Sequence, residues 1–243
     1  MVKKGVSEYE KKELSIEQKK ADKDLNIIIY ATLIPLIIYL IFGNDIMNFA
    51  KTSEMNIWLR FIPVMLVQFS LAGLGSLIVI CYRKEELKEY GLVKNNFFKT
   101  IILSLVVCIP SMIFLLVNNE INSYLPLKGC FFTSLFLNSN YPTNILGYIL
   151  IAFVWGIVEG FNYVVISKKI NERYISKNKW LNYGAIVCGI ACVLIHGMVG
   201  FDLYTIFEAL TTFIIIYGML IVKEKTNNAW GCIFIFLFFW NAI

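Results

Sequence analysis

The chain has 243 residues, of which 58% are hydrophobic and only 16% are charged, and its mean hydropathy is +0.68. A soluble domain of this size could not cover so much apolar surface with so few charges, so a soluble fold is excluded. The net charge of +5 comes from basic loops beside membrane segments, and it predicts no nucleic-acid partner.

Seven apolar stretches approach or exceed the length of about 20 residues that a helix needs to cross a bilayer. They predict an all-α polytopic membrane bundle of about seven spans, with the lipid bilayer as its first partner and the plasma membrane as its location. In chain order the predicted spans are Leu25–Phe42, Ile57–Tyr82, Phe98–Val117, Ile145–Ser167, Leu181–Val199, Leu203–Val222 and Ala229–Ile243.

The basic residues alternate between the two sides of these spans. Of 22 Lys and Arg residues, all but Lys51, Arg60 and Lys128 lie before the first span or in every second loop. Cytoplasmic loops carry such an excess, so the N-terminus is predicted to be inside and the C-terminus outside. Residues 1–24 mix seven lysines with six acids and lack an apolar stretch, which predicts a solvated cytoplasmic arm rather than a signal peptide. Residues 25–243 are predicted to form a single membrane domain.

Two segments between the spans are predicted to lie at the membrane surface. The sequence RKEELKEYGLVKNN predicts a short charged helix that ends at Gly91 on the inner side, with Leu87, Tyr90 and Leu92 facing lipid. On the outer side, the apolar patch Cys130–Leu137 is too short to span and is predicted to be interfacial or to fold back on the bundle.

Glu159 lies inside the fourth apolar run, nine residues before Lys168. At 1.5 Å per residue the carboxylate is therefore about 13 Å below the inner surface. An ionisable group at that depth costs several kcal/mol at least, and it marks a functional site unless it is neutral and bonded to a neighbouring helix. Both interpretations remain open. Asn162 and Tyr163 follow by three and four residues, so they share its helix face.

His196 is the only histidine of the chain and follows Cys188 and Cys192 at four-residue steps. These three side chains share one helix face, and with Glu159 they would make a tetrahedral zinc set. The alternative is that the cysteines are small residues that allow close helix packing. Glu208, about one turn below the outer surface, is a second buried acid with a structural or a site role.

The order of these parts resembles the CAAX-protease and bacteriocin-processing (CPBP, abortive-infection) family of intramembrane metalloproteases. A charged inner helix ending in EYGLVKNN is followed by a span, a Glu-bearing span, a His-bearing span and an aromatic span that ends in Asn241. The family pattern is Glu-Glu-x-x-x-Arg, Phe-x-x-x-His and His-x-x-x-Asn on separate spans. The resemblance implies a water activated by glutamate, with the histidines and the asparagine holding a metal, zinc, or the oxyanion.

This chain keeps part of that pattern. Glu159, His196 and Asn241 match, and they are the candidate catalytic residues, with Glu159 and His196 as the candidate metal ligands and Asn162 and Glu208 as second choices. The other positions differ: Gly160 replaces the second glutamate, Val164 the arginine, Cys192 the phenylalanine and Leu237 the second histidine.

The incomplete set predicts a divergent, inactive member of the family that binds a membrane peptide or protein partner, as in peptide immunity. One alternative is an active intramembrane metalloprotease that uses Glu159 and His196. These two residues are predicted to differ by about 10 Å in depth on straight helices. A second alternative is a small transporter or channel with Glu159 as its proton or cation site.

Overall fold

The computed structural model describes residues 14–52, 54–178 and 180–242, whose regular structure is helical throughout. Five helices in it are long and apolar enough to cross a membrane. Three of them are the single helices α1 (Ile16–Thr52), α4 (Phe97–Val117) and α9 (Leu203–Thr226). The other two are continuous helices with a π-helical segment in the middle. One consists of α2 (Ile57–Phe69), η1 (Ser70–Leu74) and α3 (Gly75–Arg83), and the other of α6 (Thr143–Ile151), η3 (Ala152–Val158) and α7 (Glu159–Arg173). The all-α class and a multi-pass membrane protein are thus confirmed.

Two shorter apolar helices complete the bundle, and both occupy predicted spans. They are α8 (Tyr183–Ile195) and the pair α10 (Trp230–Ile235) and η4 (Phe236–Trp240). At 1.5 Å per residue each is shorter than the roughly 30 Å hydrocarbon core. The count of seven crossings and the orientation of the termini therefore stay predictions.

Helix boundaries differ from the predictions at several places, as where α1 continues to Thr52 rather than Phe42 and α7 to Arg173 rather than Ser167. Helix α1 begins at Ile16 rather than Leu25, so its first turns use residues predicted to form a solvated arm, whose residues 1–13 lie outside the described part. Helix α8 ends at Ile195 rather than Val199, because the chain leaves helical geometry at Gly197, where φ is +68°. Only glycine adopts that conformation at little cost.

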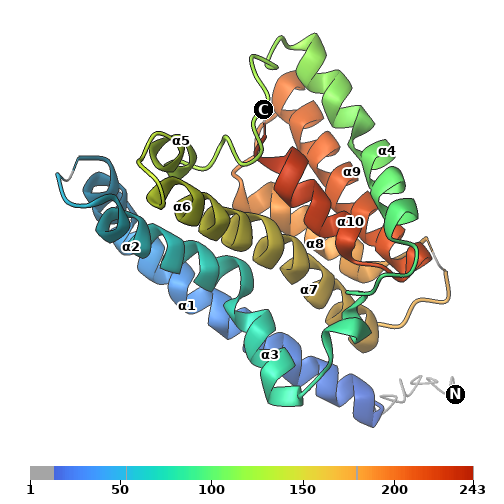
Figure 1. Cartoon of the computed structure of the whole chain (residues 1–243). Coiled ribbons are helices and arrows are strands. Elements are labelled where there is room, and N and C mark those ends of the chain that lie inside the picture. Colours follow the sequence, from blue (N-terminus) through green and yellow to red (C-terminus); the bar gives the residue numbers. More distant parts are fainter. Residues whose placement is uncertain (1–13, 53, 179, 243) are drawn as a thin grey trace, which may run out of the picture.

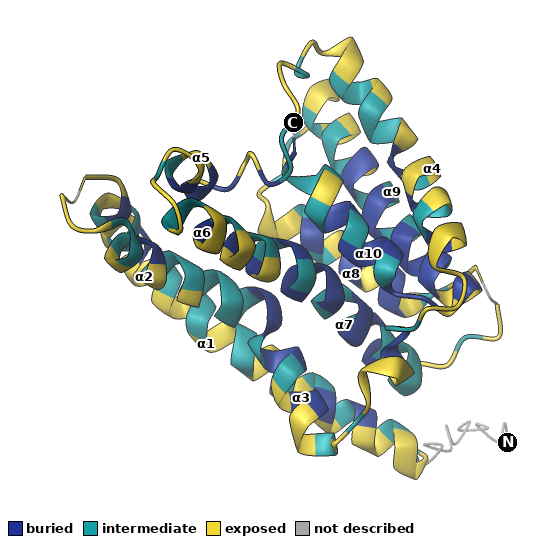
Figure 2. Cartoon of the chain, viewed as in Figure 1, coloured by how far each residue is buried: buried dark blue, intermediate teal, exposed yellow. Residues whose placement is uncertain are grey.

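Helix α7 lies at the centre of the bundle, between α1 on one side and α8 and α10 on the other (Figure 1). Its buried face includes Val164 and Val165, which are fully buried. Figure 2 shows buried residues along α7, α9 and α10 and exposed residues along much of α1. Because the exposed side chains of α1 between Ile29 and Phe42 are mostly Ile and Leu, this part of its surface is suited to lipid rather than water.

The segment Cys130–Leu137 folds back on the bundle, as predicted. It contains the short helix α5 (Phe132–Leu137), whose Phe132 and Phe136 are buried against Phe61 of α2 with ring centroids 5.3 and 5.0 Å apart. Such edge-to-face aromatic contacts add to the energy of apolar burial. A second apolar core lies among α7, α8, α9 and α10.

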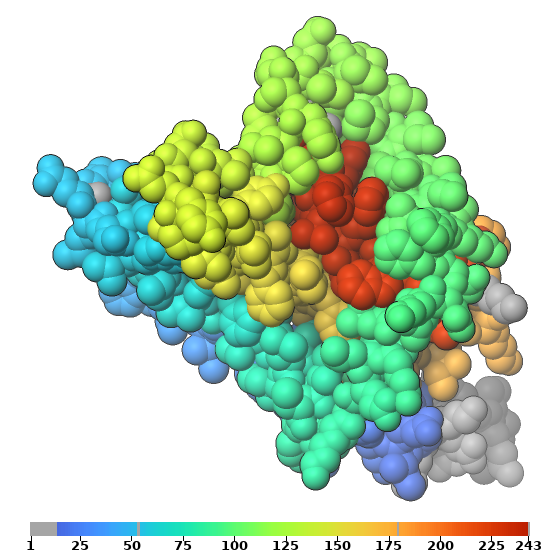
Figure 3. Space-filling view, viewed as in Figure 1, coloured from blue at the N-terminus to red at the C-terminus, as the bar shows by residue number. Residues whose placement is uncertain are grey.

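The C-terminal helix is held between neighbours on the visible face of the molecule. Figure 3 shows the surface of α10 and η4 (red) between those of α4 (green) and α6–α7 (yellow). After this helix the main chain is hydrogen-bonded to the outer loop. The carbonyl of Asn241 accepts a hydrogen bond from the amide of Gly129 and that of Ala242 from the amide of Leu125, both at 2.9 Å.

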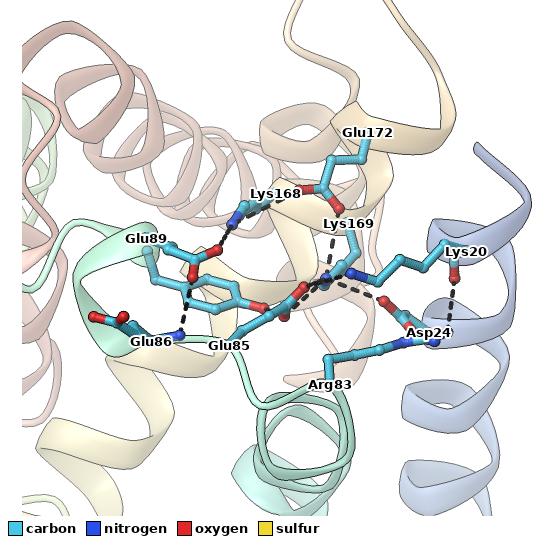
Figure 4. Close-up of polar contacts among 10 residues, drawn as sticks. Lys20, Asp24, Arg83, Glu85, Glu86, Glu89, Lys168, Lys169 and Glu172 are labelled. Carbon is cyan, nitrogen blue, oxygen red and sulfur yellow. Dashed lines mark hydrogen bonds and ion pairs between the residues drawn. The ribbon is translucent and has the colours of Figure 1, made fainter. Parts of the chain in front are cut away.

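A buried ion cluster joins three segments at the end of the bundle predicted to be cytoplasmic (Figure 4). The Lys169 ammonium on α7 is 2.8 Å from Glu85, which follows α3, and 3.1 Å from Asp24 of α1. Arg83 also pairs with Asp24, at 2.6 Å. The side chains of Lys169 and Asp24 are 1% and 0% exposed, so this pairing compensates charges that water does not reach.

The short inner helix is present as the 3₁₀ helix η2 (Leu87–Tyr90), and it ends at Gly91 as predicted. The φ angle of Gly91 is +93°. The prediction that Tyr90 faces lipid is wrong. Tyr90 is fully buried, its hydroxyl donates to Glu85, and Lys168 lies 4.2 Å from its ring centroid. A tyrosine has an apolar ring and a polar hydroxyl, and here the ring is buried while the hydroxyl contacts the ion cluster.

The ion cluster is expected to make stability depend on acidity. Burial raises the pKa of Glu85, but hydrogen bonds from Lys169 and Tyr90 and the charges of Lys169 and Lys20 outweigh it and lower the pKa from 4.5 to about 2. A carboxyl whose pKa is lower in the folded chain stabilises it above the unfolded pKa and loses this contribution as pH falls towards the folded value.

The measurement is the thermal midpoint of the detergent-solubilised protein between pH 6 and pH 2. We expect a fall below about pH 4.5 that is steeper in the wild type than in Glu85→Gln. Glu86→Gln is the matched control, since the Glu86 side chain is 62% exposed. Parallel curves for the wild type and Glu85→Gln would contradict this expectation.

Candidate functional site

Glu159 is buried at the start of α7, with 8% of its surface exposed. The Gln68 side chain of α2 donates a hydrogen bond of 2.8 Å to its Oε2 atom. Among the described residues, no hydrogen bond involves the second carboxyl oxygen, Oε1. The carboxyl group thus has one fixed neighbour from another membrane helix and one oxygen left for another group.

Asn162 lies on the same face of α7, one turn further on, as predicted. Its Oδ1 atom accepts a hydrogen bond of 2.5 Å from Ser76 of α3. Glu159 and Asn162 are therefore both directed at the helix that runs from α2 to α3. Hydrogen bonds between membrane helices stabilise their association by about 0.6 to 2 kcal/mol each.

Three π-helical segments meet beside Glu159. Segment η3 directly precedes it and contacts both η1, which follows Gln68 by two residues, and η4. Glycines permit this approach: a Cβ at Gly73 would lie 2.1 Å from Val158, and a Cβ at Gly156 would lie 2.2 Å from Leu237. Single π turns inside α-helices occur frequently at functional sites, because they turn side chains and backbone groups out of register.

His196 lies in a different neighbourhood from Glu159. It follows the last residue of α8, is exposed, and its ring contacts Trp240 edge-on with centroids 5.5 Å apart. Trp240 packs on Phe236, which stacks on Tyr163 of α7 at 5.3 Å. Two aromatic rings thus stand between His196 and the tyrosine one turn beyond Glu159.

Asn241 and Glu208 also lie apart from the Glu159–Gln68 pair. The Asn241 Oδ1 atom would be 3.3 Å from a Cβ at Gly129, so its side chain lies against the outer loop. Glu208 of α9 is half-buried in a small crevice of about 240 Å³ that also contains Glu120 and Trp240. Neither residue shares a hydrogen bond with Glu159.

The predicted zinc ligands do not assemble. Across residues 14–52, 54–178 and 180–242, no group of three His, Cys, Asp or Glu side chains could hold a metal ion. Cys188 and Cys192 are 2% and 0% exposed inside α8, with the exposed His196 beyond its end. Zinc needs three or four converging ligands, which this arrangement does not offer. The zinc binding predicted from the sequence stays untested.

Sequence reasoning missed the partners of the two site residues on α7. Gln68 stands in an otherwise apolar run, and an amide inside a membrane segment is itself a signal of an interhelical hydrogen bond. Ser76 gives no such signal, because serine is common at helix contacts for its small size.

No protein family, curated protein or solved structure matches the chain. The resemblance to the CAAX-type proteases therefore rests on the motif residues alone.

Proposed function

We propose that the protein is a divergent member of the CAAX-type intramembrane protease family that binds a membrane peptide or protein partner without cleaving it. The plasma membrane is the proposed location. Glu159 is the proposed contact for a polar group of the partner, because it is a carboxyl inside an apolar helix, with one oxygen bonded to Gln68 and the other without a hydrogen bond among the described residues.

The surroundings of Glu159 support binding over hydrolysis. A general base has to position a water, and the oxyanion of the transition state needs donors or a metal. Here the hydrogen-bonded neighbour of Glu159 is an amide, which does not titrate, whereas His196 contacts Trp240 instead. The π segments η1, η3 and η4 make the backbone irregular in the helices that contain them, at the depth where a partner would bind.

Binding and cleavage can be separated with a fluorescent prenylated peptide that ends in a CAAX sequence, added to the protein in nanodiscs. Fluorescence anisotropy reports binding and mass spectrometry reports peptide products. We expect saturable binding of an intact peptide, at least tenfold weaker for Glu159→Leu and unchanged for His196→Ala. Glu208→Leu on α9 is the matched control for removal of a carboxyl group within a membrane helix.

Two outcomes would overturn the proposal. Equal binding by the wild type and Glu159→Leu would remove Glu159 from the recognition of the peptide. Peptide products from the wild type that disappear in Glu159→Gln would establish an active protease, because glutamine keeps an acceptor for Gln68 but cannot act as a base.

Proton or cation translocation is the second candidate function. It is favoured by the irregular helical backbone around an intramembrane carboxyl, which also forms ion sites in transporters. Proteoliposomes loaded with a pH-sensitive dye distinguish it: a proton flux that Glu159→Gln abolishes would favour transport, and an equal rate in empty vesicles would exclude it.

A further inference from the structure

A wide apolar groove of about 1320 Å³ opens between α1 and α8, with α7 at its base. One wall presents Ile29 and Leu33 of α1, and the other presents Val187 and Ile195 of α8, all of them exposed. Ile170 of α7 lies between them. The lining residues of α8 run from Tyr183 to Ile195, so the groove follows this helix for about 18 Å at 1.5 Å per residue.

The chemistry of the groove changes at its end on the side of the ion cluster. There Arg173, Tyr174, Lys177 and Tyr183 join the lining, beside Leu14 and Ile175. Tyrosines of this kind lie at the level of lipid headgroups in membrane proteins. The loop charges predict this to be the cytoplasmic side, where anionic lipids create a negative surface potential.

Both cations at this end retain donors for a ligand. Arg173 uses Nε to bind Asp22 at 2.8 Å, and no described residue accepts a hydrogen bond from its two terminal nitrogens. Lys177 has no ion-pair partner among the described residues. An arginine and a lysine that line one groove and have unused N–H groups complement a phosphate, which accepts several charge-assisted hydrogen bonds.

We propose that this groove binds one anionic phospholipid, with the phosphate at Arg173 and Lys177 and the acyl chains between α1 and α8. A basic pocket between membrane helices on the cytoplasmic side is a known way to hold anionic headgroups. The site is separate from Glu159 and does not depend on the function proposed above.

The walls favour acyl chains over a helix of a partner protein. Membrane helices associate through small residues that let their backbones approach. Here the lining contains no glycine, and in the hydrocarbon region only Ala191 and Thr32 are small among Ile, Leu and Val. Flexible acyl chains can follow such an uneven surface without requiring a matching set of ridges.

Native mass spectrometry of the full chain in mild detergent tests the proposal, with defined phosphatidylglycerol or phosphatidylcholine added at equal concentrations. We expect at least fivefold more bound phosphatidylglycerol in the wild type. Lys177→Glu is expected to remove this preference, and Val187→Trp to reduce binding of both lipids by filling the groove. Lys94→Glu and Ile190→Trp are the matched controls, since both residues are exposed and lie outside the groove.

The same experiment can overturn the proposal. Equal binding of the two lipids, or a preference that survives Lys177→Glu, would show that the headgroup is not recognised here. An equal loss in Lys94→Glu would assign the effect to general surface charge. A photo-crosslinking side chain at Val187 is expected to add the mass of a lipid in membranes, whereas attachment to a polypeptide would identify a partner helix as the occupant and exclude the lipid.

Discussion

Replacing Lys169 with methionine is expected to lower the free energy of unfolding by about 3 kcal/mol. Methionine preserves most of the side-chain volume but leaves Asp24, which is 0% exposed, and Glu85 without their shared cation. Removing one partner of a buried ion pair costs about 3–5 kcal/mol in other proteins. We expect the lower value, because Arg83 still pairs with Asp24.

Denaturant unfolding in detergent, followed by tryptophan fluorescence, measures this effect. Lys94→Met is the matched control and is expected to change stability by less than about 0.5 kcal/mol, since Lys94 is exposed. Adding Glu85→Gln to Lys169→Met is expected to restore part of the loss, because one uncompensated carboxylate is then removed. A loss in Lys169→Met no greater than that of Lys94→Met would show that the cluster does not stabilise the bundle.

Replacing Gly184 with valine is expected to separate α8 from α7 and to lower the free energy of unfolding by about 3 kcal/mol, the upper end of overpacking effects. A Cβ at Gly184 would lie 2.2 Å from the backbone carbonyl oxygen of Ser167. A backbone atom cannot rotate away, so one helix has to move. The movement would also break the 2.9 Å hydrogen bond from the Gly184 amide to Asn171.

Gly43→Val is the control for this substitution. The atoms nearest to a Cβ at Gly43 all belong to the Tyr39 side chain, which can change rotamer. The measurement is the thermal midpoint of each variant in the same detergent. A drop in Gly184→Val of the same size as in Gly43→Val would contradict the close backbone contact between α7 and α8.

The class of the fold could be predicted because it depends on hydrophobicity summed over many residues. The common face of Glu159 and Asn162 could be predicted for a similarly simple reason, since helical spacing alone determines it. Their partners Gln68 and Ser76 could not, because the pairing of helices depends on side-chain packing over the whole bundle.

The ion cluster and the position of His196 show two further limits. Asp24 and Lys169 lie near the ends of apolar runs, where charged side chains normally reach water, yet both are fully buried by neighbouring segments. His196 was predicted inside a span because the apolar run continues to Val199, but α8 ends at Ile195. A hydropathy pattern does not indicate where a helix ends inside an apolar run. Gly197, which can adopt a positive φ, was the local signal for the end of α8.

We infer that Glu159 and His196 belong to separate sites and do not share a metal. Zinc analysis of the purified protein, with Glu159→Gln and His196→Ala beside the wild type, tests this inference. We expect far less than one equivalent of zinc in all three proteins. Close to one equivalent in the wild type, lost in both variants, would contradict the claim and would favour an active metalloprotease.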